Sequence, residues 1–270
     1  MQYPERLKIL PLSEIGDYSM TENASKHNGP DHIGIIMDGN GRWAQSQGLS
    51  RIKGHHQGVE TCRPIIEACQ ELDIHYLTLY AFSAENWKRP ESEVNALMEL
   101  LELFLMNETE TLVKQRVRLH AIGRVEDLPA RPRAALKKAM DVTREFDEWH
   151  LTLALNYSSR NEIVDATKAI AAKAAAGKLD PKDLDWETIS DHLYTKELPD
   201  PDLIVRTSGE TRLSNFLLMQ SAYAEFYFTA TCWPDFTKAH LEEAIRSYHN
   251  RERRFGRTGE QVDVEASLSF

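Results

Sequence analysis

The sequence predicts a single-domain α/β fold with a mostly parallel, six-stranded sheet flanked by helices. Short apolar runs rich in β-branched residues alternate with longer segments whose apolar residues recur at the helical period. Strands that alternate with helices are typical of a parallel sheet with helices on both faces. The 270 residues suffice for one large domain, and no internal repeat or linker rich in Pro, Gly or Ser divides them.

The individual elements follow from the same patterns. We expect strands at 33–36, 75–82, 117–122, 151–155, 203–205 and 225–229. We expect helices at 55–72, 92–113, 131–146, 162–176, 186–194, 216–223 and 237–255. Pro64 is expected to kink the first helix, and the polar segment 44–54 is interpreted as a mobile loop. An N-terminal extension (1–30) and a C-terminal tail (257–270) flank the folded domain, 31–256.

Composition narrows the class of protein. Hydrophobic residues make up 41% of the chain, as in an ordinary globular protein. The formal net charge of −10 argues against a nucleic-acid binder but not against a local basic pocket. Cys62, Cys69 and Cys232 form no C-x-x-C motif and indicate buried thiols in a reducing cytoplasm. No apolar run approaches ~18 residues and the N-terminus lacks a signal-peptide core, so a cytoplasmic protein is expected.

A polar turn directly follows the first predicted strand. The stretch from His32 to Trp43 reads H-I-G-I-I-M-D-G-N-G-R-W. Glycine and Asn tolerate positive φ, so the backbone can bend sharply and bring its N–H groups close to a ligand. Asp38 suits a hard cation such as Mg²⁺, and Arg42 can grip a phosphate with two donors. The alternative is an ordinary tight turn in which Asp38 caps its own backbone.

Polar groups also follow the strands predicted at 75–82 and 203–205. Ligands of open α/β sheets bind outside the carboxyl ends of the strands. The candidate site residues are therefore Asp38, Arg42, Arg51, His55, Asn86, Arg89, Arg206, Arg212, Ser214 and Glu225. Arginine dominates this set, which suits diphosphates and one metal ion, and no Ser/His/Asp or Cys/His arrangement stands out. The alternative for His55 is a surface residue that caps the start of its helix.

Two further observations concern the substrate. The P-loop pattern and G-x-G-x-x-G are both absent, which disfavours a nucleotide. The helix expected at 92–113 carries an unusually wide apolar stripe. A core-facing helix is the ordinary explanation, but the extra width leaves room for lining a cavity for an apolar ligand. Diphosphates beside such a wall suggest an isoprenoid.

Three long motifs in this order resemble the signatures of the cis-prenyltransferases, the undecaprenyl diphosphate synthase family. They are H-I-G-I-I-M-D-G-N-G-R-W-A from His32, L-T-L-Y-A-F-S-A-E-N-W-K-R-P from Leu77 and P-D-L-I-V-R-T-S-G-E-T-R-L-S-N-F from Pro201, with W-P-D-F and R-E-R-R-F-G after them. The resemblance covers the catalytic domain, 31–256. One departure is Ser158-Ser159, where the family usually has Gly-Gly.

The resemblance implies a fold with an apolar tunnel and a role for each site residue. Asp38 would position Mg²⁺, with Glu225 as a further ligand. Asn86 is a candidate proton acceptor, and the alternatives are the released diphosphate and water. The allylic diphosphate would be held by Gly39, Asn40, Gly41, Arg42, Trp43, Arg51 and His55. The groups around the reacting carbons would be Ser83, Ala84, Glu85, Asn86, Trp87 and Arg89. Isopentenyl diphosphate would bind to Arg206, Arg212, Leu213 and Ser214.

The implied activity is a Mg²⁺-dependent condensation of isopentenyl diphosphate with an allylic diphosphate, farnesyl diphosphate being the expected primer. The product would be a long Z-polyprenyl diphosphate such as undecaprenyl diphosphate, the lipid carrier precursor for cell-wall synthesis. The resemblance also implies a homodimer, with Arg254-Phe255-Gly256 reaching the neighbouring site, and a cytoplasmic enzyme peripheral to the inner face of the membrane, with which its product associates. It gives no reason to expect a nucleic-acid partner.

Several alternatives stay open or are disfavoured. A short- or medium-chain synthase is one, and a non-catalytic partner subunit is another, although such subunits tend to lack the first Asp and the phosphate-binding residues. A phosphatase with Asp38 as nucleophile leaves the wide helix unexplained, and the D-D-x-x-D motifs of trans-type synthases are absent. Product length would depend on a bulky side chain at the tunnel floor, with Trp149 and Phe104 as candidates.

Overall fold

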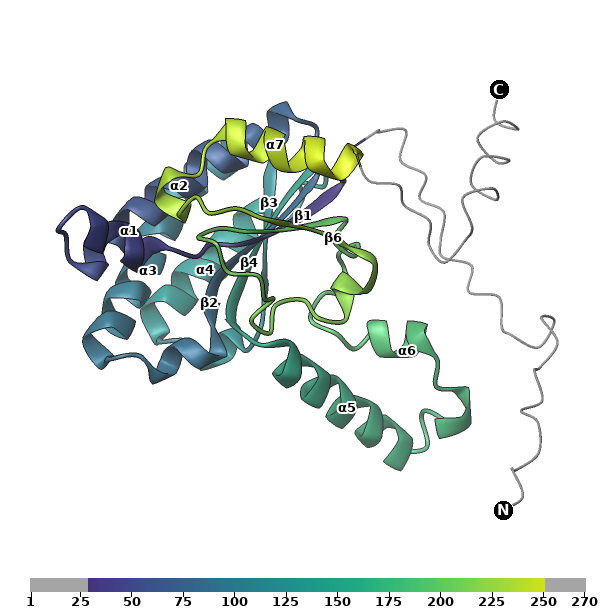
Figure 1. Cartoon of the computed structure of the whole chain (residues 1–270). Coiled ribbons are helices and arrows are strands. Elements are labelled where there is room, and N and C mark those ends of the chain that lie inside the picture. The colour runs from purple at the N-terminus through teal and green to yellow at the C-terminus, as the bar shows by residue number, and fades with distance from the viewer. Residues whose placement is uncertain (1–28, 251–270) are drawn as a thin grey trace, which may run out of the picture.

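The structure is a computed structural model and describes residues 29–250 (Figure 1). Its centre is a six-stranded parallel sheet with the strand order β3-β4-β2-β1-β5-β6. The strands are β1 (His32–Ile36), β2 (Tyr76–Ser83), β3 (Val117–Ile122), β4 (Trp149–Tyr157), β5 (Leu203–Arg206) and β6 (Glu225–Phe228). The predicted fold class is confirmed, and β3 begins and ends at the predicted residues.

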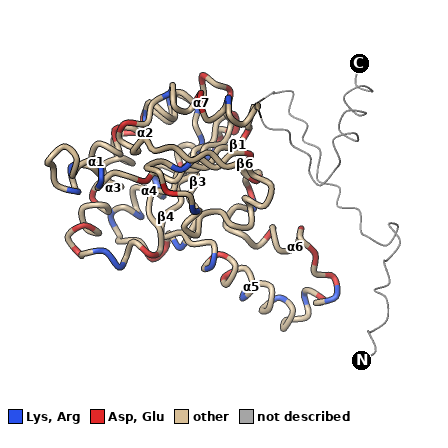
Figure 2. Tube along the Cα trace, in the orientation of Figure 1, with Lys and Arg blue, Asp and Glu red and all other residues tan. Residues whose placement is uncertain are grey.

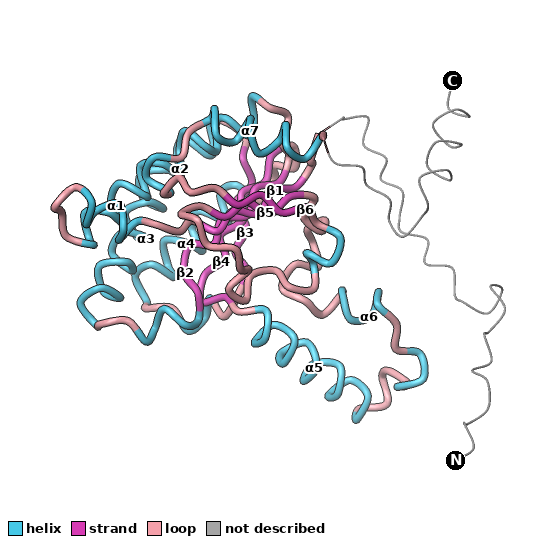
Figure 3. The backbone as a smooth tube through the Cα atoms, viewed as in Figure 1, coloured by secondary structure: helices cyan, strands magenta, loops and turns pink. Residues whose placement is uncertain are grey.

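Helices connect consecutive strands from β1 to β5, whereas β5 and β6 are joined by an irregular segment (Figure 3). The helices are α1 (Asn40–Ser46), α2 (Arg51–Glu71), α3 (Glu91–Lys114), α4 (Ala130–Thr143), α5 (Ser159–Ala175), α6 (Trp186–Ser190) and α7 (Lys238–His249). Short 3₁₀ turns add η2 (Ala84–Lys88), η3 (Val125–Asp127), η4 (Pro181–Asp183), η5 (Gln220–Tyr223) and η6 (Trp233–Asp235). Pro64 lies inside α2, which runs on past it to Glu71.

The two faces of the sheet are covered differently. Alternate residues of the strands, such as Ile33 and Ile35, pack with α2, α3, α4 and α7 in the larger core cluster. The opposite face carries Ile36 and Ile204, which pack with Phe216, Leu217 and neighbouring irregular segments. On this face, residues of irregular segments rather than helices supply most of the packing against the strands. In Figure 1, α5 runs away from the sheet.

The segment predicted as a mobile loop, 44–54, is mostly helical, and this prediction is wrong. It contains the end of α1 and the first turn of α2, which begins four residues before the predicted start. The two helices pack closely because α2 has glycine where they touch. A Cβ on Gly54 would lie 2.0 Å from the carbonyl oxygen of Asn40, and one on Gly58 would lie 2.6 Å from its Oδ1. This polar segment therefore belongs mostly to two ordered helices, α1 and α2.

The helix predicted at 216–223 is also wrong. Leu217 has φ 44°, in the left-handed region, so a right-handed helix cannot run through it. Only the short turn η5 forms, at Gln220–Tyr223. The predicted extension up to residue 28 and the segment from 251, including Arg254-Phe255-Gly256, lie outside the described residues.

Charged residues of both signs are interspersed along the helices (Figure 2). In the described part of the chain, no helix is long and apolar enough to cross a membrane.

Candidate active site

The chain turns sharply after β1, and this turn fixes the carboxylate of Asp38. Gly39 has φ 104°, and a Cβ there would lie 2.7 Å from the Cβ of Ser208 and 2.9 Å from Sγ of Cys232. The N–H of Gly39 donates to Oδ1 of Asp38 (2.7 Å), and the hydroxyl of Thr207 donates to the carbonyl of Asp38 (2.7 Å). The predicted turn therefore exists, and it packs against the end of β5.

Two arginines converge on the second oxygen of Asp38. Its Oδ2 accepts from Nη2 of Arg206 (3.0 Å) and from Nη2 of Arg42 (3.2 Å). Arg206 is only 4% exposed, whereas the Arg42 side chain is about half exposed. Burial would raise the pKa of Asp38, but hydrogen bonds from Arg206 and Gly39 and the charges of both arginines lower it overall. Asp38 is therefore ionised at neutral pH.

A second carboxylate, Glu93 near the start of α3, gathers three more basic side chains. Its Oε1 accepts from Nε2 of His55 (3.1 Å) and from Nη1 of Arg89 (3.0 Å), and its Oε2 lies 3.4 Å from Nε of Arg51. Burial would raise the pKa of Glu93, but these neighbours lower it below its usual value. Glu93 is not among the predicted site residues, although its spacing of four from Arg89 is a signal for such a pair.

His55 is held in one tautomer between two partners. Its Nε2–H donates to Glu93, which leaves Nδ1 to accept from the side-chain amide of Asn40 at 3.5 Å. Burial lowers the pKa of His55, the charges of Arg89 and Arg51 lower it further, and Glu93 opposes them. His55 is therefore neutral at pH 7. It is a buried group of the site, not a surface residue of α2.

The turn after β2 is closed by a capping box. The N–H of Ser83 donates to Oδ1 of Asn86 (3.0 Å), while the Ser83 hydroxyl accepts from the Asn86 backbone. Trp87 points elsewhere, since its Nε1 donates to Oδ1 of Asn156 on β4 (2.8 Å). This turn begins next to a β-bulge in the pairing of β2 with β4, a common irregularity beside functional sites.

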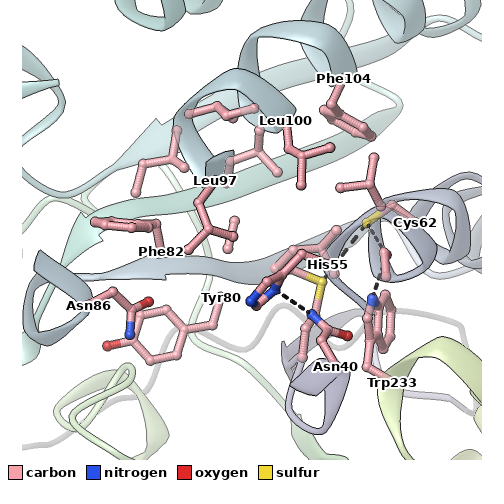
Figure 4. Close-up of a pocket in the computed structure, with 18 of the residues that line it drawn as sticks. Asn40, His55, Cys62, Tyr80, Phe82, Asn86, Leu97, Leu100, Phe104 and Trp233 are labelled. Carbon is pink, nitrogen blue, oxygen red and sulfur yellow. Dashed lines mark hydrogen bonds between the residues drawn. The ribbon is translucent and has the colours of Figure 1, made fainter. Parts of the chain in front are cut away.

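Two cavities meet at this edge of the sheet. A polar, open cleft of about 760 Å³ contains Asp38, Ser83, Glu85, Arg206, Leu213 and Ser214 among its lining residues. An apolar cavity of about 150 Å³ lies among β2, β4, α2 and α3, and Figure 4 shows it with Asn86 at one end and Phe104 at the other. Both cavities are lined by Met37, Tyr80, Asn86 and Arg89. The polar groups thus adjoin an apolar chamber walled partly by α3.

Glu225 does not join this site. It begins β6 and pairs with Leu203 at the amino end of β5, whereas Asp38 follows the opposite ends of the strands. Five residues of strand separate the two levels, which is roughly 16 Å at about 3.3 Å per residue. Within one chain, Glu225 and Asp38 therefore cannot share a metal ion, because the parallel register sends them to opposite edges of the sheet. No group of three or more His, Cys, Asp or Glu suited to a metal occurs in residues 29–250.

Other predicted residues lie near the site in different ways. Trp43 donates its Nε1 to Oδ1 of Asp235 (2.8 Å) and lines neither cavity. The Arg212 side chain is 64% exposed and paired with Glu210, while its backbone carbonyl accepts from Arg206. Arg51 lies against α1, since a Cβ on Gly41 would be 3.0 Å from its Cζ. Asn40 lines the apolar cavity, and Ala84 belongs to η2.

Of the two residues expected at a tunnel floor, only Phe104 lines the apolar cavity. Trp149 is the first residue of β4, at the amino end of the strand, where it stacks on His75 with ring centroids 5.0 Å apart. It contributes instead to a separate small cavity with Ile66 and Leu77. Trp149 is thus not at the floor of the described cavity, because β4 extends two residues further back than predicted.

Comparison with known proteins agrees with this arrangement. Residues 36–256 match the family model described as "Putative undecaprenyl diphosphate synthase". An isoprenyl transferase of Heliobacterium mobile is 52% identical over 240 residues, which are 89% of this chain and 92% of that protein. An isoprenyl transferase of Geobacter sulfurreducens is 49% identical over 237 residues, 88% of this chain and 96% of that protein.

Two solved structures are also similar. Lavandulyl diphosphate synthase from Lavandula x intermedia, in complex with dimethylallyl diphosphate, has a TM-score of 0.83 and 40% identity, covering 85% of this chain and 99% of that one. A "probable undecaprenyl diphosphate synthase" from Campylobacter jejuni has a TM-score of 0.71 and 37% identity, covering 86% and 100%. The chain therefore belongs to the undecaprenyl diphosphate synthase family, the cis-prenyltransferases.

Proposed function

We propose that this enzyme condenses isopentenyl diphosphate with an allylic diphosphate, with farnesyl diphosphate as the primer, to form a long Z-polyprenyl diphosphate such as undecaprenyl diphosphate. The observation that carries the proposal is the junction of an arginine-rich polar cleft with an apolar cavity at Asn86 and Arg89. A diphosphate with a hydrocarbon tail requires both environments side by side. Such a product would serve as lipid carrier precursor for cell-wall synthesis and would pass to the membrane, while the enzyme itself works in the cytoplasm.

The two clusters of basic residues suit the two diphosphates. His55 and Arg89 line the apolar cavity, and Arg51 shares Glu93 with them, so we assign the allylic diphosphate to these three residues together with the turn from Gly39 to Arg42. The first turn of α1 has backbone N–H groups without helical partners. Two buried polar atoms near this turn, Oδ1 of Asn40 and Nε of Arg206, also lack a partner in the described residues.

Isopentenyl diphosphate is assigned to the other side of the cleft, at Arg206, Ser214 and Leu213. Nη1 of Arg206 donates to the Ser214 hydroxyl (2.7 Å), so both groups face the same part of the cleft. Arg212 contributes a charge at the rim, since its side chain is mostly exposed. Two diphosphates can be held side by side only if several cations offset their mutual repulsion, and the arginines of the cleft provide these charges. Binding both substrates next to each other also brings the reacting carbons together.

Mg²⁺ fits the chemistry at Asp38. This carboxylate is ionised and partly exposed, and Mg²⁺ is commonly held by one or two carboxylates together with substrate phosphates and water. When bound, the ion would neutralise charge on the departing diphosphate. In one chain, Asp38 would be its carboxylate ligand, with Arg206 and Arg42 holding the carboxylate in place.

The last step removes a proton from the condensed chain, and Asn86 is poorly suited to accept it. An amide is a weak base, and its Oδ1 already accepts the N–H of Ser83. We therefore assign the proton to the released diphosphate, whose oxygens are more basic, and assign to Asn86 the role of lining the junction between the two cavities.

A homodimer is also part of the proposal. Exposed apolar side chains gather on α5, α6 and the segment up to β6, a surface that we call the α5–α6 face: Ile163, Val164, Leu184, Trp186, Ile189, Leu218, Met219, Tyr223 and Phe228. Many large apolar side chains on one side of a molecule are typical of an interface. A second copy of this chain would cover them.

Product analysis tests the function. Purified enzyme, farnesyl diphosphate, labelled isopentenyl diphosphate and Mg²⁺ should yield a long-chain product on reversed-phase chromatography, whereas Asp38→Ala should retain less than about a tenth of the turnover with an unchanged far-UV circular dichroism spectrum. A short or medium product would identify the alternative synthase. No incorporation of isopentenyl diphosphate would contradict the proposal and favour a non-catalytic partner subunit.

A further inference from the structure

We propose that Asn215 is a positioning residue for the diphosphate of isopentenyl diphosphate. It lies directly after Ser214 in the segment 212–217, which supplies one wall of the polar cleft. The inference rests on the proposed function, because it takes this part of the cleft as the site of isopentenyl diphosphate. Its basis is a strained backbone that one side chain ties to two neighbouring elements.

The backbone of this segment is unusual. Ser214 has φ 48°, Asn215 has φ 66° and Leu217 has φ 44°, so three of four consecutive residues adopt the left-handed region without being glycine. Each such residue is strained, and a segment of this kind persists only where its surroundings hold it. Asn is among the residues that tolerate this region best, whereas Leu is not. The strain thus needs tethers.

Asn215 supplies four of these tethers. Its Nδ2 donates to the hydroxyl of Ser158 (2.6 Å) and to Oε1 of Glu85 (2.9 Å). Its Oδ1 accepts from the N–H of Arg160 (3.1 Å), and its backbone carbonyl accepts from the N–H of Ser159 (3.0 Å). Glu85 belongs to η2 after β2, and the other three partners lie at the start of α5. One side chain therefore joins the ends of two strands to the segment.

A second set of hydrogen bonds also attaches this segment to the start of α5. The N–H of Leu218 donates to the hydroxyl of Ser159 (2.9 Å), which also contacts the hydroxyl of Tyr157 (3.0 Å). Tyr157 in turn donates to Oε2 of Glu162 (2.6 Å), and both Ser159 and Glu162 are fully buried. The hydroxyls of Ser158 and Ser159 thus have defined partners, although neither serine is a predicted site residue.

The attachment matters for the site because the segment also holds Arg206. Nη1 of Arg206 donates to the Ser214 hydroxyl and to the backbone carbonyl of Arg212, while its Nη2 holds Asp38. A shift of Asn215 would move Ser214 and those acceptors together. Loss of these hydrogen bonds should therefore weaken binding of isopentenyl diphosphate. The residues assigned to the allylic diphosphate, around Glu93, Arg51 and Arg89, do not bond to this segment.

Two substitutions separate strain from tethering. Asn215→Gly removes the three side-chain bonds but relieves the strain, because glycine adopts φ 66° without a Cβ penalty. This variant should fold, and its KM for isopentenyl diphosphate should rise about tenfold. The corresponding loss of binding free energy is roughly the net contribution of one hydrogen bond. Asn215→Ala loses the same bonds and keeps the penalty, so its KM should rise further. The KM for farnesyl diphosphate should stay within about twofold of wild type in both.

Asn95→Ala is the matched control, since Asn95 is exposed on α3 and lines neither cavity. Steady-state kinetics with each substrate varied, together with thermal unfolding, provides the readout. If the wild type condenses both substrates but Asn215→Gly keeps its KM for isopentenyl diphosphate, the positioning role is wrong. Equal rises in both KM values would also overturn it, because they indicate general loss of structure. A wild type without any condensation refutes the proposed function instead.

Discussion

At the scale of single residues, the site is organised by two carboxylates that each hold basic side chains in place. Asp38 holds Arg206 and Arg42, and Glu93 binds His55 and the guanidinium of Arg89. Without such anions, clustered cations would repel one another and their long side chains would be disordered. Each carboxylate therefore prepares a cationic surface to which a diphosphate can bind without reorganisation.

The role of Glu93 can be tested by removing its charge alone. Glu93→Gln keeps the shape but weakens the hold on His55, Arg51 and Arg89, so the KM for the allylic substrate should rise about tenfold. The KM for isopentenyl diphosphate should change little. Steady-state kinetics would reveal the difference, with Glu91→Gln, an exposed residue of the same helix, as the control. An equal change in the two KM values would contradict the assignment.

Arg206 and Arg212 should respond differently to substitution by lysine. Arg206 is buried and uses two nitrogens to bind Asp38 and Ser214, a geometry that lysine cannot reproduce. Arg206→Lys should therefore raise the KM for isopentenyl diphosphate strongly and lower kcat. Arg212→Lys should have the smaller effect, because its guanidinium is exposed at the rim. A larger effect of Arg212→Lys would mean that the exposed arginine moves inward on binding.

His55 should take up a proton when the allylic diphosphate binds. Its pKa is lowered in the free enzyme, mainly by burial, so at pH 6.5 it is mostly neutral. A neighbouring diphosphate would raise that pKa. Calorimetric titration in two buffers of different ionisation enthalpy measures the uptake, and His55→Asn should remove it. Identical proton uptake in the variant would exclude His55 as the acceptor.

The same pKa direction affects stability. Because the folded-state pKa of His55 lies below its unfolded value of about 6.5, its contribution is fully present above that pH and is lost as the pH falls toward the folded-state value.

At the scale of elements, α3 offers two sides for comparison. Phe104 lines the apolar cavity, while the adjacent Leu103 is 48% exposed. If the product grows along this cavity, Phe104→Ala should lengthen it, because the growing chain gains room, and Leu103→Ala should leave it unchanged. Mass spectrometry of the products measures the distribution. Trp149→Ala should also have no effect, since Trp149 lies outside the cavity. A distribution that changes with neither Phe104→Ala nor its neighbours Leu100 and Leu101 would place the tunnel elsewhere.

The elements also explain what could be predicted from the sequence. The β-branched run at 33–36 and the alternation at Val117–Ile122 specify strands locally, and both segments form strands in the structure. α1 escaped prediction because its contact with α2 depends on the small size of Gly54 rather than on an apolar stripe. The turn near Leu217 escaped because its positive φ is imposed by tertiary hydrogen bonds.

Three residues predicted from the ends of strands, Asp38, Asn86 and Arg206, do lie together along the polar cleft. The distance of Glu225 from Asp38 within one chain could not be predicted, because a motif gives no register and only the pairing with Leu203 shows where Glu225 lies; its role as a metal ligand stays a prediction. Glu93 and Asn215 were missed because a helix acid and a loop amide are ordinary surface residues unless their partners are known.

At the scale of the whole molecule, the α5–α6 face should mediate dimer formation. Trp186 and Ile189 are both exposed on α6. The double substitution Trp186→Glu with Ile189→Glu should convert a dimer into a monomer, because a charge cannot be buried in the interface without a partner. Light scattering after size-exclusion chromatography measures the mass. Val142→Glu, on the exposed side of α4, is the control. A wild-type protein that elutes as a monomer at micromolar concentration would contradict the proposed homodimer.

The position of β1 in the sheet has a consequence for how the enzyme is made. β1 pairs with β2 on one side, but its other edge stays open until β5 is added, and Asp38 and Arg206 are 168 positions apart in the chain. Contacts between such distant residues form slowly, and an open strand edge invites wrong pairing in the meantime. A nascent chain on the ribosome can therefore pair four of the six strands, β3-β4-β2-β1, without possessing a reaction centre. Catalysis becomes possible only after residue 206 has been synthesised and β5 has paired with β1.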